Sequence, residues 1–300
     1  MSLELKLSIK KHPSKDAEAQ YDDLVGIDDH KSALLSFLEL TLNPEKITQW
    51  LKTHHSKGLP YLDRLNLSAP LIILSGEVGC GKTALASSIA TPLGKLLDTR
   101  ILTLEPPTNL RGSGLVGEIS KRITDTFDNA KASLSSSPSG QGILILDEAD
   151  DIATARSQMQ AHHEDRAGLN ALIKQLDKLK EDKIKLAVIL ITNRPEVVDP
   201  AVRRRASLEL VFSRPDVIQL EALFNRILAG TNPTKSEISS LVDASKSKSI
   251  PFSFSDLTNK VAKAAILECL RSDKKLTAGE LLAAVRHATP SPLLSESTNG

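Results

Sequence analysis

Residues 71–83 read LIILSGEVGCGKT, an apolar run followed by a glycine-rich turn that ends in a lysine and a threonine. The consecutive apolar residues predict a strand buried on both faces, and residues 84–90 predict the helix that follows it. Gly76, Gly79 and Gly81 allow backbone turns that side chains would block, so successive N–H groups can point at phosphate oxygens. The segment therefore predicts a phosphate-binding loop between a strand and a helix.

This loop matches the pattern G-x-x-x-x-G-K-T of a Walker A motif. Lys82 would supply a positive charge to the outer phosphates, and the hydroxyl of Thr83 suits Mg²⁺, which prefers hard oxygen ligands. The alternative is an ordinary turn with a solvated lysine, but this spacing arises by chance in roughly one chain of this length in a hundred. The predicted nucleotide-binding residues of the loop are Gly76, Val78, Gly79, Cys80, Gly81, Lys82, Thr83 and Ala84.

The composition is that of a soluble globular protein. The 300 residues are 40% hydrophobic and 25% charged, and the net charge of +1 creates no overall field that would attract nucleic acid or an anionic membrane. The two cysteines, Cys80 and Cys269, exclude a disulfide framework and favour a reducing compartment. No apolar run has the length of a membrane span or a signal peptide, so we expect a cytoplasmic protein.

Residues 142–150, GILILDEAD, form the second informative stretch, an apolar strand that ends in adjacent carboxylates. Ligands of parallel sheets bind at the carboxyl ends of the strands, so Asp147 would lie beside the phosphate loop if this strand neighbours the first. Asp147 would then hold Mg²⁺ through water, and Glu148 would orient or deprotonate an attacking water. The alternative is an acidic turn in which an aspartate caps a helix.

Two further polar segments follow apolar ones. Asn193 ends the predicted strand 185–192 and would hydrogen-bond the same water or an outer phosphate, or else simply begin a turn. Residues 203–205 are three successive arginines, which cannot all face one carboxylate. They predict an arginine finger that reaches the phosphates of a neighbouring subunit, with a solvated basic turn or a nucleic-acid contact as the alternative.

The rest of the chain indicates an α/β domain followed by helices. Residues 1–20 predict a short edge strand or a flexible arm, and the glycine-rich residues 109–118 predict a mobile loop with a hydrophobic tip or a plain connection. We expect further strands at 100–104 and 207–212, helices at 28–42, 119–134 and 168–179, and only helices from 216 to 288. The Ser/Pro-rich end predicts disorder.

The segments GEVGCGKT, GILILDEAD, ITNRPEVVDPAVRRRA and FSFSDL resemble the motifs of AAA+ ATPases, and the resemblance covers residues 21–287. It implies an αβα sandwich with a five-stranded parallel sheet, a small α-helical lid domain and a ring of six subunits. The implied domains are an N-terminal extension at 1–20, the nucleotide-binding domain at 21–213, the lid at 214–288 and a disordered tail at 289–300.

The resemblance also assigns roles to single residues. It implies that Val25 and Gly26 contact adenine, that Asn193 is sensor 1, and that Arg204 and Arg205 belong to the arginine-finger region. Two positions depart from the family pattern. The segment that resembles the substrate-gripping pore loop contains Leu115 and Val116, with Leu115 where the family usually has an aromatic residue, and the sensor-2 position holds Ser255 rather than an arginine.

Within the superfamily, the stretch from residue 114 through the helix after 150 is most similar to the pachytene-checkpoint remodelers, whose clients are HORMA-domain proteins, and to compact bacterial relatives that regulate antiphage signalling. This implies an ATPase that uses ATP and Mg²⁺ to unfold or disassemble a protein client. The alternative is a DNA-associated AAA+ switch or loader, which the near-zero net charge and the scarcity of aromatic residues disfavour. Lys82, Asp147 and Glu148 disfavour an inactive nucleotide-bound scaffold.

Overall fold

The computed structural model describes residues 6–55, 57–59, 70–107, 118–151 and 163–293. The chain divides into two compact units. The first, which we call the sheet unit, comprises Met1–Tyr21, Asp29–Ser75 and Thr83–Val211. The second, the helical unit, comprises Asp22–Asp28, Gly76–Lys82 and Phe212–Gly300, so the glycine-rich loop belongs to it.

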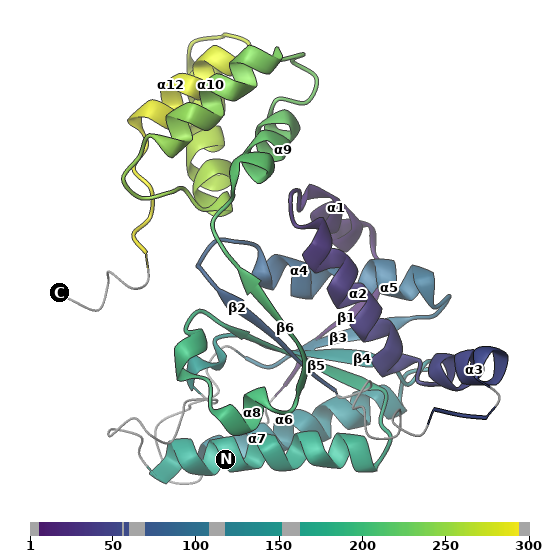
Figure 1. The fold of residues 1–300 in the computed structure, drawn as a ribbon. Coiled ribbons are helices and arrows are strands. Elements are labelled where there is room, and N and C mark those ends of the chain that lie inside the picture. The colour runs from purple at the N-terminus through teal and green to yellow at the C-terminus, as the bar shows by residue number, and fades with distance from the viewer. Residues whose placement is uncertain (1–5, 56, 60–69, 108–117, 152–162, 294–300) are drawn as a thin grey trace. The chain divides into compact units, whose positions relative to one another are not determined.

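A six-stranded sheet in the order β1-β3-β4-β5-β2-β6 forms the centre of the sheet unit (Figure 1). Parallel pairing joins β2 to β5, β5 to β4 and β4 to β3, whereas β1 lies antiparallel to β3 at one edge. The mostly parallel α/β architecture confirms the predicted fold class, and β1 adds the short edge strand that was one alternative for residues 1–20. The strands are β1 (Ser8–His12), β2 (Leu71–Gly76), β3 (Ile101–Glu105), β4 (Gly142–Leu146), β5 (Leu186–Thr192) and β6 (Ala206–Phe212).

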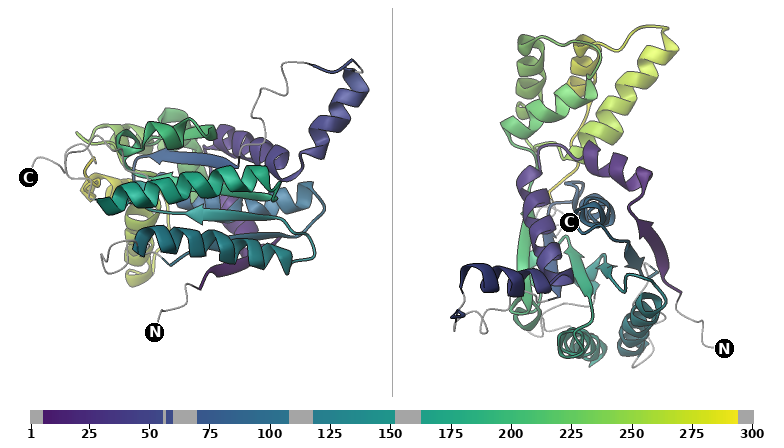
Figure 2. Two further views of the ribbon diagram at one scale, coloured as in Figure 1. Left: turned by 90° about the horizontal axis from the view of Figure 1, so that it is seen from below. Right: turned by 90° about the vertical axis from the view of Figure 1, so that its right-hand side faces the viewer.

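Helices cover both faces of this sheet. Figures 1 and 2 show α6 (Glu118–Ser135) and α7 (His163–Glu181) along one face, with α2 (Asp28–Leu42), α4 (Lys82–Ser88) and α5 (Ala90–Leu96) along the other. Because neither face meets water, all residues of β4 and β5 are buried, which explains their continuous apolar sequences. The remaining helices of this part of the chain are α1 (Lys15–Asp23), α3 (Glu45–His54) and α8 (Pro200–Arg203), with 3₁₀ turns at Ala149–Asp151 and Pro195–Val197.

The two helices α6 and α7 approach each other closely at Gly168. The stripe Ile119, Ile123 and Phe127 of α6 is buried in the main apolar core, as the spacing predicts. A Cβ atom added to Gly168 would lie 2.4 Å from Cγ2 of Ile119, closer than van der Waals contact permits. The absence of a side chain at Gly168 therefore sets how near α7 lies to α6.

The helical unit has its own apolar core, in which Phe224, Leu241, Leu257 and Leu281 are buried. Its helices are α9 (Val217–Ile227), α10 (Lys235–Lys246), a π-helix at Asp256–Ala262, α11 (Lys263–Arg271) and α12 (Ala278–His287), in agreement with the purely helical pattern of the sequence. Asp216 and Thr234 begin α9 and α10 with capping boxes, so local hydrogen bonds fix both helix starts. None of the helices in the described residues is long and apolar enough to cross a bilayer.

A buried carboxylate at Asp256 joins the end of the chain to this unit. Asp256 is 1% exposed and accepts hydrogen bonds from Ser253, from Lys260, and from both the backbone N–H and the hydroxyl of Ser291. Burial raises its pKa, but these hydrogen bonds outweigh burial and hold the pKa of Asp256 well below its usual range. Residues 289–293 of the predicted tail are thus attached to the unit, while 294–300 lie outside the described residues.

We expect Gly168→Ala to lower the free energy of unfolding by about 1–3 kcal/mol, because the new methyl group overlaps Ile119 in a closely packed core. Gly279→Ala in α12 is the matched control, since the nearest atom to its added Cβ is Thr277 Oγ1 at 3.6 Å. That variant should stay within about 0.5 kcal/mol of the wild type or gain from the helix propensity of alanine. Urea denaturation measures both, and equal stability of the two variants would contradict the close approach of α6 and α7.

We expect Asp256→Asn to lower the free energy of unfolding by about 2–3 kcal/mol at pH 7, because charge-assisted hydrogen bonds are lost from a buried site. Because the pKa of Asp256 is lower in the folded than in the unfolded state, its ionised form stabilises the fold above the unfolded-state pKa of about 4. This stabilisation is lost as pH falls below that value. The difference from wild type should therefore shrink below about pH 4. Asp243→Asn, at an exposed position of α10, is the control. A pH-independent difference would rule out a charged Asp256 as its cause.

Candidate active site

A hydrogen bond between Thr83 and Asp147 brings two of the predicted residues together. Thr83 Oγ1 donates to Asp147 Oδ2 at 2.8 Å. The strand 142–146 does not neighbour the strand 71–76, because β5 lies between β4 and β2, so the condition set for the placement of Asp147 is not met. The contact forms across the intervening strand because the carboxyl ends of parallel strands meet at the same edge of the sheet, where strands two positions apart are separated by about 10 Å.

The same carboxylate also fixes the residue that follows it. Asp147 Oδ1 accepts the backbone N–H of Glu148 at 2.8 Å, and Glu148 has a left-handed φ of +53°. A non-glycine residue in this conformation carries backbone strain that often marks a functional site. The side chain of Glu148 is exposed, whereas that of Asp147 is half-buried. The arrangement presents a hydroxyl and a carboxylate, both hard oxygen ligands, next to the exposed Glu148.

The end of β5 lies at this same edge. Asn193 follows the last strand residue and is half-buried, and its side-chain amide makes no hydrogen bond with the described residues. The hydroxyl of the preceding Thr192 donates to Asp150 Oδ1 and accepts the N–H of Arg194 at 2.9 Å. This hydrogen bond between residues at the ends of β4 and β5 was not predicted, although the sequence shows a further carboxylate at Asp150 after Asp147 and Glu148.

Within the helical unit, the glycine-rich loop holds its own lysine. Lys82 is 5% exposed, and its ammonium donates to the carbonyl oxygens of Gly76 at 2.8 Å and Glu77 at 2.6 Å. Gly76 has a φ of +115°, and a Cβ atom there would lie 2.1 Å from the carbonyl oxygen of Phe212. The loop conformation therefore requires glycine at this position, and the lysine side chain is fixed within the loop.

Further contacts of the helical unit surround the same loop. The backbone N–H of Ser255, at the predicted sensor-2 position, donates to the carbonyl of Gly79 at 2.9 Å. Val25, one of the two residues assigned to adenine, packs against the apolar core of the unit. The carbonyl of the other, Gly26, accepts a hydrogen bond of 2.7 Å from the Gln219 side chain in the first turn of α9. The unit thus holds the two predicted adenine residues together with the loop.

The remaining loop residues differ in exposure. Val78 is exposed at the loop surface, Gly81 and Ala84 are half-buried, and Cys80 is buried. Burial raises the pKa of the Cys80 thiol to about 11, so this thiol stays protonated near neutral pH. Cys80 is therefore a packing residue of the loop and not a nucleophile.

The three arginines at 203–205 have different partners. Arg205 donates two hydrogen bonds, of 2.9 and 3.0 Å, to the carboxylate of Asp177 on α7, which raises the pKa of Arg205. Arg203 pairs with Glu209 at 3.3 Å. Arg204 is exposed and makes no ion pair with a carboxylate of the described residues. Arg204 is thus the arginine of the three whose charge is available to a molecule outside the chain.

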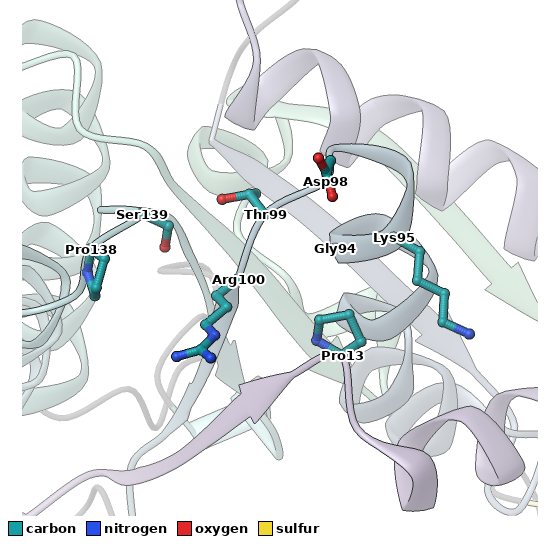
Figure 3. Close-up of a pocket in the computed structure, with 8 residues that line it drawn as sticks. All are labelled: Pro13, Gly94, Lys95, Asp98, Thr99, Arg100, Pro138 and Ser139. Atoms are coloured by element: carbon teal, nitrogen blue, oxygen red, sulfur yellow. The ribbon is translucent and has the colours of Figure 1, made fainter.

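The predicted pore-loop residues Leu115 and Val116 lie outside the described residues. A cavity of about 640 Å³ is present in the sheet unit, lined by Pro13, Lys95, Arg100, Ser139 and other residues labelled in Figure 3. Arg100 precedes β3 and Ser139 precedes β4, so the cavity is at the amino ends of these strands, opposite the edge that carries Asp147. In Figure 3 the side chains of Lys95 and Arg100 extend away from each other, and they do not form a common anion site.

Comparisons with known proteins find a matching family model and curated relatives. The model of the ATPase family associated with various cellular activities (AAA) matches residues 72–214. CD-NTase-associated protein 6 of Escherichia coli strain MS 115-1 is 33% identical over 289 residues, which cover 93% of each protein. A second CD-NTase-associated protein 6, from Escherichia coli strain KTE188, is 32% identical over 95% of each protein.

Two solved structures share the fold along nearly the whole chain. One is a chain of the Escherichia coli MS115-1 HORMA:CdnC:Trip13 complex, with a TM-score of 0.88, 33% identity, and coverage of 97% of this chain and 98% of that one. The other is Rhizobiales Trip13, with a TM-score of 0.75, 31% identity, and coverage of 95% and 98%. The chain therefore belongs to the AAA family of ATPases and is similar over nearly its full length to CD-NTase-associated protein 6 and Trip13.

Proposed function

We propose that this protein is an ATP-driven remodeler that acts, as a hexamer, on a HORMA-domain protein client in bacterial antiphage signalling. The hydrogen bond from Thr83 to Asp147 carries the catalytic part of the proposal, because it joins the hydroxyl of the Walker A motif to the carboxylate after the apolar strand. The similarity to a chain from the HORMA:CdnC:Trip13 complex supports the client. The division into a nucleotide-binding domain at 21–213 and a lid at 214–288 stays part of this proposal.

The residues fit ATP and Mg²⁺. The ammonium of Lys82 is held among loop carbonyls and would bind the outer phosphates, with Gly76, Val78, Gly79, Cys80, Gly81 and Ala84 completing the loop. Thr83 and Asp147 would hold Mg²⁺, which when bound supplies positive charge that stabilises the transferring phosphoryl group. Val25 and Gly26 would contact adenine.

Three groups would act on hydrolysis itself. The exposed Glu148 carboxylate would orient or deprotonate the attacking water, since the backbone at this residue is fixed by Asp147. The amide of Asn193, which has no hydrogen-bond partner among the described residues, is suited to bind the same water or an outer phosphate. Of the arginine-finger candidates Arg204 and Arg205, we propose that Arg204 reaches the neighbouring subunit, because Arg205 is already paired with Asp177. Leu115 and Val116 would contact the client.

The proposed client is tested by measuring whether a protein or DNA stimulates ATP hydrolysis. ATPase rates are measured for the full chain alone, with a bacterial HORMA-domain protein, and with double-stranded DNA at physiological salt. We expect stimulation by the HORMA-domain protein. Stimulation by DNA and not by the protein would instead identify a DNA-associated switch or loader, and the proposed function would be wrong.

We expect Glu148→Gln to bind ATP and to hydrolyse it at least about a hundredfold more slowly, because the neutral amide cannot accept a proton from water. Single-turnover hydrolysis and equilibrium ATP binding separate the two effects. Glu181→Gln, an exposed glutamate at the end of α7, is the matched control and should keep the wild-type rate. Retained hydrolysis in Glu148→Gln would remove Glu148 from the mechanism.

We expect Arg204→Ala to bind ATP normally and to lose turnover by about a thousandfold, the scale on which an arginine finger acts. Arg203→Ala is the control for an exposed arginine at this turn. Arg205→Ala breaks the exposed pair with Asp177 and should cost about 0.2–1 kcal/mol of stability, with a smaller loss of turnover than Arg204→Ala. The reverse order of the two rates would assign the finger to Arg205.

A further inference from the structure

Arg214, which follows β6, connects three separate segments of the helical unit. Its side chain is 6% exposed and its guanidinium reaches the phosphate-binding loop, the turn before the π-helix, and the C-terminal segment 289–293. One nitrogen, Nη1, donates to the carbonyls of Pro251 and of Ser291, the latter at 2.9 Å. The other, Nη2, donates to the Pro292 carbonyl at 2.9 Å and lies 3.5 Å from Glu77 Oε2.

Glu77 links this guanidinium to the lysine of the loop. The backbone N–H of Glu77 donates to the carbonyl of Phe212 at 2.9 Å, and its own carbonyl accepts the ammonium of Lys82 at 2.6 Å. With its side chain paired to Arg214, Glu77 is held at three points. A continuous set of contacts therefore runs from the C-terminal segment through Arg214 and Glu77 to Lys82.

The charge of Glu77 gives Arg214 a second role. A carboxylate within a phosphate-binding loop repels a bound polyphosphate, and the repulsion is strong where the surroundings are poorly solvated. Glu77 is partly shielded from water, with a side chain 27% exposed, and Arg214 is the cation that pairs with it. Arg214 thus neutralises the one acidic side chain of the segment 76–82.

The C-terminal segment is fixed on its other side by Ser291. The backbone N–H and the hydroxyl of Ser291 donate to Asp256, at 3.1 and 2.7 Å, and Lys260 Nζ donates to the same hydroxyl at 2.7 Å. Since the carbonyl of Ser291 accepts from Arg214, every polar group of this residue is hydrogen-bonded. Docking of residues 291–292 and placement of the Arg214 side chain therefore depend on each other.

We propose that Arg214 is a positioning residue of the phosphate loop and that docking of the C-terminal residues 291–292 onto it sets the nucleotide affinity. The inference rests on the proposed binding of nucleotide to the loop. It predicts that losing either Arg214 or the docked segment weakens nucleotide binding, through Glu77 and Lys82, without removing any group that contacts the phosphates.

Full-chain variants with ADP carrying a fluorescent mant label as the probe test this inference. Arg214→Met should weaken binding of the probe about tenfold and raise the KM for ATP with a smaller change in kcat, since contacts to a buried charged group are lost. Arg214→Lys should not restore affinity, because a single ammonium cannot serve acceptors that a planar guanidinium reaches with two nitrogens. Arg286→Met, at an exposed arginine of α12 in the same unit, should bind like the wild type.

Ser291→Pro tests the C-terminal segment separately, because proline has neither the N–H nor the hydroxyl that Asp256 accepts. It should weaken binding in the same direction, and its effect should be less than additive with Arg214→Met, because both changes release the same contacts. This variant leaves Arg214 intact and so keeps the proposal testable even where Arg214→Met folds poorly.

A charge rescue separates positioning from general destabilisation. Glu77→Gln in the Arg214→Met background should recover at least threefold in affinity, because it removes the carboxylate that Arg214 no longer neutralises. Unchanged probe affinity and KM in Arg214→Met and Ser291→Pro, with only a lower thermal midpoint, would overturn the inference alone. Failure of the wild-type chain to bind the probe or hydrolyse ATP would overturn the proposed function together with the inference.

Discussion

The hydrogen bond from Thr83 to Asp147 depends on the parallel order of the central strands. β2 and β4 both run parallel to β5, so their carboxyl ends lie at the same edge; if one of them were reversed, its carboxyl end would lie at the opposite edge, and neither side chain is long enough to span the sheet. Parallel strands need crossover helices on both faces, and those helices bury the strands completely. The apolar sequence of β4 and β5 and the meeting of Thr83 with Asp147 are therefore two results of one topology.

Three buried charged side chains organise the helical unit in a common way. The side chains of Lys82, Arg214 and Asp256 are each nearly removed from water, and each is hydrogen-bonded to backbone groups. A buried charge that lost its partners would cost several kcal/mol, so the segments that supply them cannot move independently. This explains how a loop of seven residues and a C-terminal segment without helical structure hold defined positions in a unit otherwise made of helices.

The local sequence pattern was enough to predict the helices and strands, but it did not predict which distant segments pair. The apolar run of β4 and the amphipathic stripe of α6 are visible within a few residues, and both were located correctly. No single segment determines the order of the strands, which is why the position of β4 relative to β2 stayed a condition in the sequence analysis. In the sequence, Arg214 is visible only as an arginine before a proline at a domain boundary. Its role could not be predicted, because its partners are 37 to 137 residues away along the chain.

The hydrogen bond from Ser255 to the loop does not involve its side chain. Ser255 reaches the loop through its backbone N–H, and a Cβ atom on Gly79 would lie 2.8 Å from the Cβ of Ser255. This close approach requires glycine at 79. The positive charge that pairs with Glu77 of the loop comes from Arg214, which follows β6 in the chain.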